Sequence, residues 1–96
     1  MLIKVVTVCG MGVGSSVIAK LNVENLLKKL DINGNVDSCD LGSVTSTNGD
    51  IYVTTKEIFE NLPENIKDKT IVISNFVAIK EIEEVLAPIF KKYSKI

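Results

Sequence analysis

The residues best suited to chemistry form one short segment, Val8-Cys9-Gly10-Met11-Gly12-Val13-Gly14-Ser15-Ser16. It opens with a thiol and then carries a glycine at every second position from Gly10 to Gly14. Glycine lets a backbone approach a ligand closely and permits positive φ angles, so successive N–H groups can turn toward one anion. We therefore predict that the backbone of this segment binds a phosphate-sized dianion.

Cys9 would lie at the mouth of that anion site. Thiols beside the N-terminus of a helix ionise more readily than free thiols, and a thiolate next to bound phosphate can accept a phosphoryl group on sulfur. The alternative is that Cys9 is a small buried hydrophobic residue at the end of a strand, and that the glycines only make a tight turn.

The flanking residues place this segment between a strand and a helix. The run Leu2–Val8 is apolar and rich in β-branched residues, as expected of a buried strand. Ser15 and Ser16 stand where a helix N-cap is expected, so the free N–H groups of the first turn would add to the anion site. A helical stripe then follows at Val17, Ile18, Leu21, Val23, Leu26, Leu27 and Leu30.

The rest of the chain alternates between strand and helix patterns. Pro88 lies inside the last helical pattern, where a proline removes a hydrogen bond, so we predict a kink or a break between Leu86 and Pro88. Residues 41–49 are polar and predict a loop or one ragged helical turn. Further strands are predicted at 35–40, 50–54 and 70–74, and helices at 56–62, capped by Thr55, and at 78–93.

This alternation predicts an α/β fold, a three-layer Rossmann-like sandwich with a four-stranded parallel sheet in the order 2-1-3-4 and flanking helices. Its 96 residues suffice for one domain, residues 1–96. In that strand order, the loop after the first strand lies at the switch point where open α/β sheets bind ligands.

Composition excludes several functions. The net charge of −1, with both signs dispersed, argues against binding to nucleic acid. No apolar run approaches the ~20 residues of a membrane span, and the N-terminus has no charged leader, so a cytoplasmic location is expected. The chain has no His, and its 11 basic residues are all lysines. Histidine chemistry and bidentate arginine clamps are thereby excluded within this chain, and no metal or cofactor is expected.

Three kinds of phosphate site compete for the Cys9 segment. A Cys-dependent phosphatase needs an arginine six residues after the thiol, where this chain has Ser15, so hydrolysis is disfavoured. The glycine spacing fits neither the G-x-G-x-x-G fingerprint nor a P-loop, which disfavours nucleotide binding. A phosphoryl carrier must accept the group and surrender it again, and backbone donors without an arginine clamp suit that task.

The pattern Cys9-Gly-x-Gly-x-Gly-Ser-Ser16 at the end of a first strand resembles the enzyme IIB component of the sugar phosphotransferase system (PTS), most closely its ascorbate-type branch. The lactose and cellobiose branch has a less glycine-rich loop. The similarity continues through Ser38-Cys39-x-x-Gly42, Gly49-Asp50-Ile51, Asn75 and the closing helix.

The resemblance implies a cytoplasmic phosphotransferase subunit in which Cys9 is the phosphocysteine. Cys9 would take a phosphoryl group from a phosphohistidine on the IIA component and pass it to a sugar, ascorbate-like by the branch, at the membrane IIC component. The implied phosphate-binding loop consists of Gly10, Met11, Gly12, Val13, Gly14, Ser15 and Ser16.

A second function class stays open at this point, a thiol redox or sensor domain that uses Cys9 and Cys39. Cys39 closes a strand predicted to neighbour the first, so both sulfurs would lie at the same edge of the sheet. This hypothesis requires the two sulfurs to come within disulfide reach.

Overall fold

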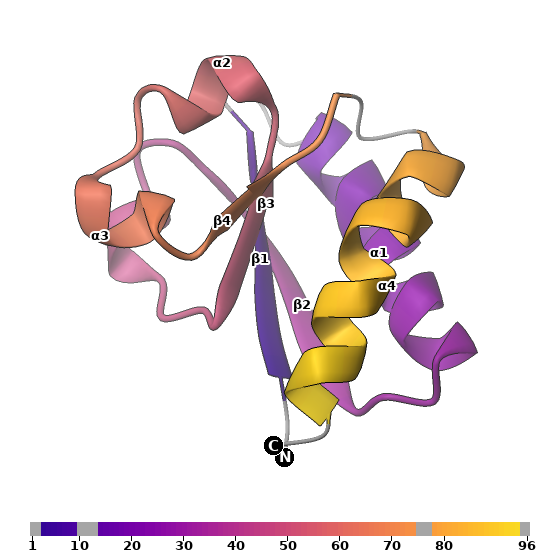
Figure 1. The fold of residues 1–96 in the computed structure, drawn as a ribbon. Coiled ribbons are helices and arrows are strands. Elements are labelled where there is room, and N and C mark those ends of the chain that lie inside the picture. Colours follow the sequence, from indigo (N-terminus) through magenta and orange to yellow (C-terminus); the bar gives the residue numbers. More distant parts are fainter. Residues whose placement is uncertain (1–2, 10–13, 75–77, 95–96) are drawn as a thin grey trace.

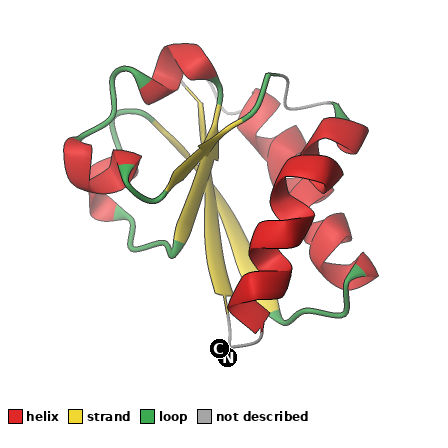
Figure 2. Cartoon of the chain, viewed as in Figure 1, coloured by secondary structure: helices red, strands yellow, loops and turns green. Residues whose placement is uncertain are grey.

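The computed structural model describes residues 3–9, 14–74 and 78–94, and it has the predicted α/β architecture (Figures 1 and 2). One sheet holds four strands in the order β2-β1-β3-β4, with every neighbouring pair parallel. The predicted order is therefore confirmed, and β1 is a central strand. The strands are β1 (Ile3–Cys9), β2 (Gly34–Asp40), β3 (Ile51–Thr54) and β4 (Thr70–Val72).

Helices cover both faces of the sheet, which completes the three layers (Figure 1). The two long helices, α1 (Gly14–Lys29) and α4 (Ile79–Ser94), lie on one face, which we call the α1/α4 face. Three short helices cover the other, which we call the α2/α3 face. They are η1 (Val44–Ser46), α2 (Lys56–Phe59) and α3 (Glu64–Lys67).

Strand β1 contributes side chains to two separate hydrophobic clusters, one on each face of the sheet. Its side chains alternate between the faces, so Val5 and Cys9 join the cluster under α1 and α4, whereas Val6 and Val8 join the cluster that contains Val44. All four of these β1 side chains are at most 2% exposed. The prediction of a strand buried on both faces is correct, as expected for a parallel sheet covered by helices.

Helix α1 begins three residues before the predicted start near Val17. Its first residue is Gly14, so Ser15 and Ser16 belong to the first turn and not to the predicted cap position. The helix ends at Lys29, and Asp31 then adopts a left-handed φ of 57°, which turns the chain toward β2.

The predicted apolar stripe of α1 is correct in the second half of the helix and wrong in the first. Ala19 and Val23 are completely buried, and Leu26 is 3% exposed. By contrast, Val17, Ile18 and Leu21 are 40%, 43% and 55% exposed. The first turns of α1 carry apolar residues on more than one side, and only the side that includes Ala19 faces the sheet.

Helix α4 runs from Ile79 to Ser94 without interruption, so of the kink or break predicted between Leu86 and Pro88, the break is absent. Pro88 deprives the carbonyl of Glu84 of its helical partner. Both residues are exposed, so water can satisfy that carbonyl without any rearrangement of the buried side. Ile82, Leu86 and Phe90 form this buried side, each at most 1% exposed.

The β4 region differs from its prediction in two ways. Strand β4 stops at Val72, two residues before the predicted end at Ser74. Val72 is 40% exposed, because β4 is an edge strand with a neighbour on one side only. Before it, Pro63 takes the N-cap position of a one-turn helix, α3, that the sequence pattern did not predict.

Within the described ranges, no helix is long and apolar enough to cross a membrane.

Candidate functional site

The end of β1 is held firmly between its two neighbouring strands. On the β2 side, Leu41 N–H donates to the carbonyl of Cys9 at 2.8 Å. On the β3 side, the Thr54 hydroxyl donates to the carbonyl of Val8 at 2.9 Å. Cys9 is therefore the last residue of a strand whose backbone is fixed from both sides, at the carboxyl edge of the sheet.

The Cys9 side chain belongs to the hydrophobic cluster on the α1/α4 face and is 2% exposed. This burial agrees with the alternative that Cys9 packs as a small hydrophobic residue. The predicted loop residues Gly10, Met11, Gly12 and Val13 lie outside the described residues. Gly14, Ser15 and Ser16 form the first turn of α1, where backbone N–H groups have no partner within the helix.

The second thiol, Cys39, points to the other side of the sheet. Cys39 is paired in register with Val8, and Cys9 is paired with Asp40. Register partners in a parallel sheet share a face, and successive residues alternate. Cys9 accordingly packs on the α1/α4 face, whereas Cys39 packs beside the cluster that contains Val8. The sheet separates the two sulfurs, which argues against the disulfide pair that the redox hypothesis requires.

Burial raises the pKa of Cys39 from 9.0 to about 11, and the negative charges of Asp40, Cys9 and Asp37 add to this effect in that order. Cys39 is therefore a protonated thiol at neutral pH, which is a poor nucleophile. Asp40 itself is exposed, and its carboxylate accepts the Ser43 N–H at 2.8 Å, so it closes the turn after β2.

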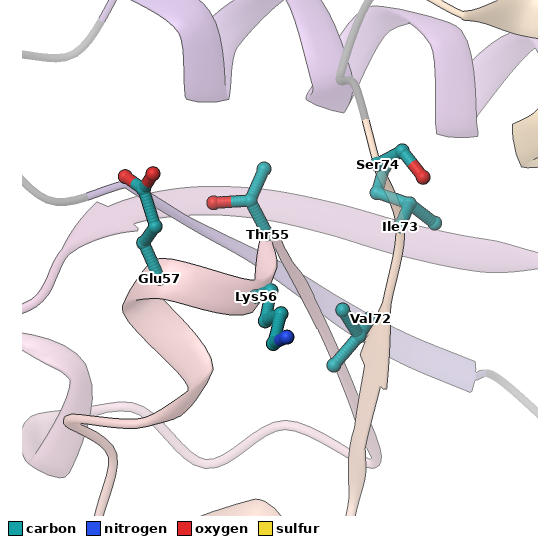
Figure 3. A pocket seen from close by; sticks show the side chains of 6 residues that line it. All are labelled: Thr55, Lys56, Glu57, Val72, Ile73 and Ser74. Carbon is teal, nitrogen blue, oxygen red and sulfur yellow. The ribbon is translucent and has the colours of Figure 1, made fainter.

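A pocket of about 470 Å³ opens at the same edge of the sheet, at the carboxyl ends of β3 and β4 (Figure 3). Glu81 supports its wall, because both carboxylate oxygens accept the N–H of Ser74, at 3.1 and 3.0 Å. In Figure 3 the side chains of Thr55 and Glu57 point toward the side on which α1 lies, and Lys56 points the opposite way. The lining residues are Thr55, Lys56, Glu57, Val72, Ile73 and Ser74.

Reasoning from the sequence did not identify this pocket, because it assigned Thr55 only to a helix cap. Thr55 does occupy the N-cap position of α2, but its side chain makes no capping hydrogen bond. The signal that could have found the pocket is topological, since residues that follow adjacent parallel strands gather at one edge. Among the described residues, no group of three or more His, Cys, Asp or Glu side chains could hold a metal ion.

Comparison with known proteins gives matches that span most of the chain. The family model described as "PTS system, Lactose/Cellobiose specific IIB subunit" matches residues 4–88. The chain is also 24% identical, over 87 residues, to the ascorbate-specific PTS system EIIB component of Mycoplasma pneumoniae, an alignment that covers 88% of this chain and 92% of that protein.

A solved structure shares the fold. The crystal structure of a YwlE mutant from Bacillus subtilis matches with a TM-score of 0.66 at 12% sequence identity, and the match covers 95% of this chain and 98% of that one. At this identity the likeness shows the fold alone.

Proposed function

The chain belongs to the family of PTS IIB subunits, as the Cys9 segment indicated, and on this basis we propose that Cys9 is its phosphoryl acceptor. The observation that carries the proposal is the position of Cys9. It is the last residue of the central strand, at the edge where α1 begins five residues later. Cys39 does not share this position, because it faces the opposite side of the sheet.

In the proposed reaction, the thiolate of Cys9 attacks the phosphorus of a phosphohistidine on a IIA component. The S–P bond forms while the N–P bond breaks, and the electron pair returns to the imidazole nitrogen. The backbone N–H groups of residues 10–16 bind the phosphoryl oxygens. In the second transfer a sugar hydroxyl oxygen attacks phosphorus and loses its proton to solvent, the O–P bond forms as the S–P bond breaks, and the electron pair returns to sulfur as the Cys9 thiolate.

The partners in this proposal are a IIA component as donor and a membrane IIC component as the site of the sugar, with the IIB chain in the cytoplasm. The name of the Mycoplasma pneumoniae relative favours an ascorbate-like acceptor. The chain itself has no histidine, so the phosphohistidine must come from another protein. Because Cys9 is 2% exposed, its sulfur must become more exposed when the donor binds.

The test is to incubate the protein with the general phosphotransfer proteins and a phosphorylated IIA component, and to record its intact mass. We expect a gain of about 80 Da in the wild type and in Cys39→Ser, and none in Cys9→Ser. Phosphorylation that persists in Cys9→Ser would refute the assignment of Cys9. Turnover of a free phosphoester without any partner protein would instead identify a phosphatase.

A further inference from the structure

We infer that Thr55 is a second side chain of the phosphoryl site, and that its hydroxyl donates a hydrogen bond to an oxygen of the group transferred to Cys9. This inference rests on the proposed function, because it needs Cys9 to accept a phosphoryl group.

The strand register brings Thr55 beside Cys9. Strands β1 and β3 are parallel, with Val5 opposite Ile51 and Thr7 opposite Val53. Two more residues along each strand lead to Cys9 and Thr55. The backbone of Thr55 is still extended, with φ −93° and ψ 166°, so the spacing of β3 continues through it. Adjacent strands are about 4.8 Å apart, which places the two residues next to each other across the edge.

Both side chains lie on the same face of the sheet. Ile51 and Val53 pack into the cluster that also contains Cys9, and Thr55 is the next residue of that alternating series. Figure 3 shows the Thr55 side chain pointing toward the side on which α1 lies. Once the sulfur of Cys9 becomes exposed, a group bonded to it would lie on the same face of the sheet as the Thr55 side chain.

The Thr55 hydroxyl is available for a ligand. A threonine at an N-cap commonly bonds to the backbone of its own helix, but Thr55 makes no such bond to α2. The residue is half-buried, and it lines the pocket of about 470 Å³. Thr55 therefore borders space that could hold a phosphoryl group, and its hydroxyl oxygen points toward the side of Glu57 (Figure 3). It is not used to close the helix that follows it.

Among the described side chains that line this pocket, Thr55 is the hydrogen-bond donor on the face that Cys9 shares. The chain has no arginine or histidine, and Lys56 points away from that face (Figure 3). Glu57 points to the same side as Thr55, but a carboxylate accepts hydrogen bonds and repels a dianion. A hydroxyl can donate to a phosphoryl oxygen without adding a full positive charge that would hold the dianion on sulfur. Hydrogen bonds to charged groups are stronger than neutral ones, so one such donor has a measurable effect on the rate.

The experiment compares Thr55→Val, which removes the hydroxyl at nearly constant shape, with Thr55→Ser, which retains it. Phosphoryl transfer from phosphorylated IIA to each variant is followed in single turnovers over a range of IIA concentrations. We expect Thr55→Val to lower the maximal rate by about 10- to 100-fold with an unchanged half-saturating IIA concentration, and Thr55→Ser to recover most of it. The ³¹P chemical shift of the phosphocysteine should also move in Thr55→Val and return in Thr55→Ser.

The matched control is Thr45→Val, which removes an exposed hydroxyl from η1 on the α2/α3 face, and it should keep the wild-type rate and ³¹P shift. Urea unfolding of all variants shows whether a slower rate reflects lost stability. Wild-type rate and ³¹P shift in Thr55→Val would overturn the role of Thr55 and leave that of Cys9 intact. A wild-type chain that never gains phosphate on Cys9 would overturn the proposed function, and the role of Thr55 with it.

Discussion

The two cysteines lie at the carboxyl ends of adjacent strands, Cys9 as the last residue of β1 and Cys39 as the last but one of β2. This offset of one residue places their side chains in different environments. Cys9 pairs with Asp40, and Cys39 pairs with Val8, so their side chains alternate to opposite faces of the sheet. Cys9 lies on the face of α1, a helix with no acidic residue in its first turn. Cys39 lies near the charges of Asp40 and Asp37, which oppose its ionisation. The comparison shows that a shift of one residue along a strand decides on which face of the sheet a thiol packs, and therefore which side chains surround it.

The first prediction concerns a disulfide between the two thiols, and its failure would show that Cys9 and Cys39 do not lie on opposite faces of the sheet. Mild oxidation of the folded chain with diamide should yield no intramolecular Cys9–Cys39 disulfide, because the sheet lies between the two sulfurs. The measurement is intact mass followed by peptide mapping without reduction. The same chain oxidised in urea, where the strands no longer separate the thiols, is the control. A mass lower by two hydrogens, with a bridged peptide, in the folded protein would show that the assigned faces are wrong.

The second prediction concerns the reactivity of Cys39 toward iodoacetamide. With its pKa raised to about 11 by burial and neighbouring negative charge, Cys39 at pH 8 should react about 100-fold more slowly in the folded chain than in urea. Its rate in the folded chain should rise about tenfold with each pH unit until the pH approaches 11. Peptide mapping separates its adduct from that of Cys9. Equal rates in the folded and unfolded chains would contradict the raised pKa.

The third prediction links the same thiol to stability. Because folding raises the pKa of Cys39 from 9.0 to about 11, the folded state binds more protons than the unfolded state between these values. The contribution of Cys39 to the free energy of unfolding is therefore fully present below pH 9 and is lost as the pH rises toward 11. Urea unfolding across this range should show a smaller decline in Cys39→Ala than in the wild type. Parallel declines in the two proteins would contradict the linkage.

The smallest predicted effect is the difference between Asp40 and Asp37 in how much each raises the pKa of Cys39. Asp40 raises the pKa of this thiol more than Asp37 does, so Asp40→Asn should lower that pKa further than Asp37→Asn. Asparagine retains an oxygen that can accept the Ser43 N–H, so the turn after β2 should stay closed. The pH dependence of alkylation measures both variants. A larger shift in Asp37→Asn would reverse the assigned order of the two charges.

Much of the fold follows from local pattern. The β-branched run before Cys9 predicted β1, and the alternation of strands with helices predicted the parallel order 2-1-3-4. Errors arose where local pattern is ambiguous. Val17, Ile18 and Leu21 fit a helical stripe as well as Val23 does, but only contact with the sheet decides which side is buried. Pro88 predicted a kink or a break, but its exposed position lets α4 continue without a break to Ser94.

In the candidate site, too, some features follow from local sequence and others depend on tertiary contacts. A thiol followed by alternating glycines makes Cys9 the candidate site residue from the sequence alone, because the spacing of residues within one loop is a local property. The separation of Cys9 from Cys39, and the position inferred for Thr55 beside Cys9, depend on strand register, which joins segments 30 and 46 residues apart. A shift of one residue in either pairing would move these side chains to the other face. The sequence alone therefore determined the candidate for the reactive residue, and tertiary structure decided its neighbours, since register is settled by packing across the whole sheet.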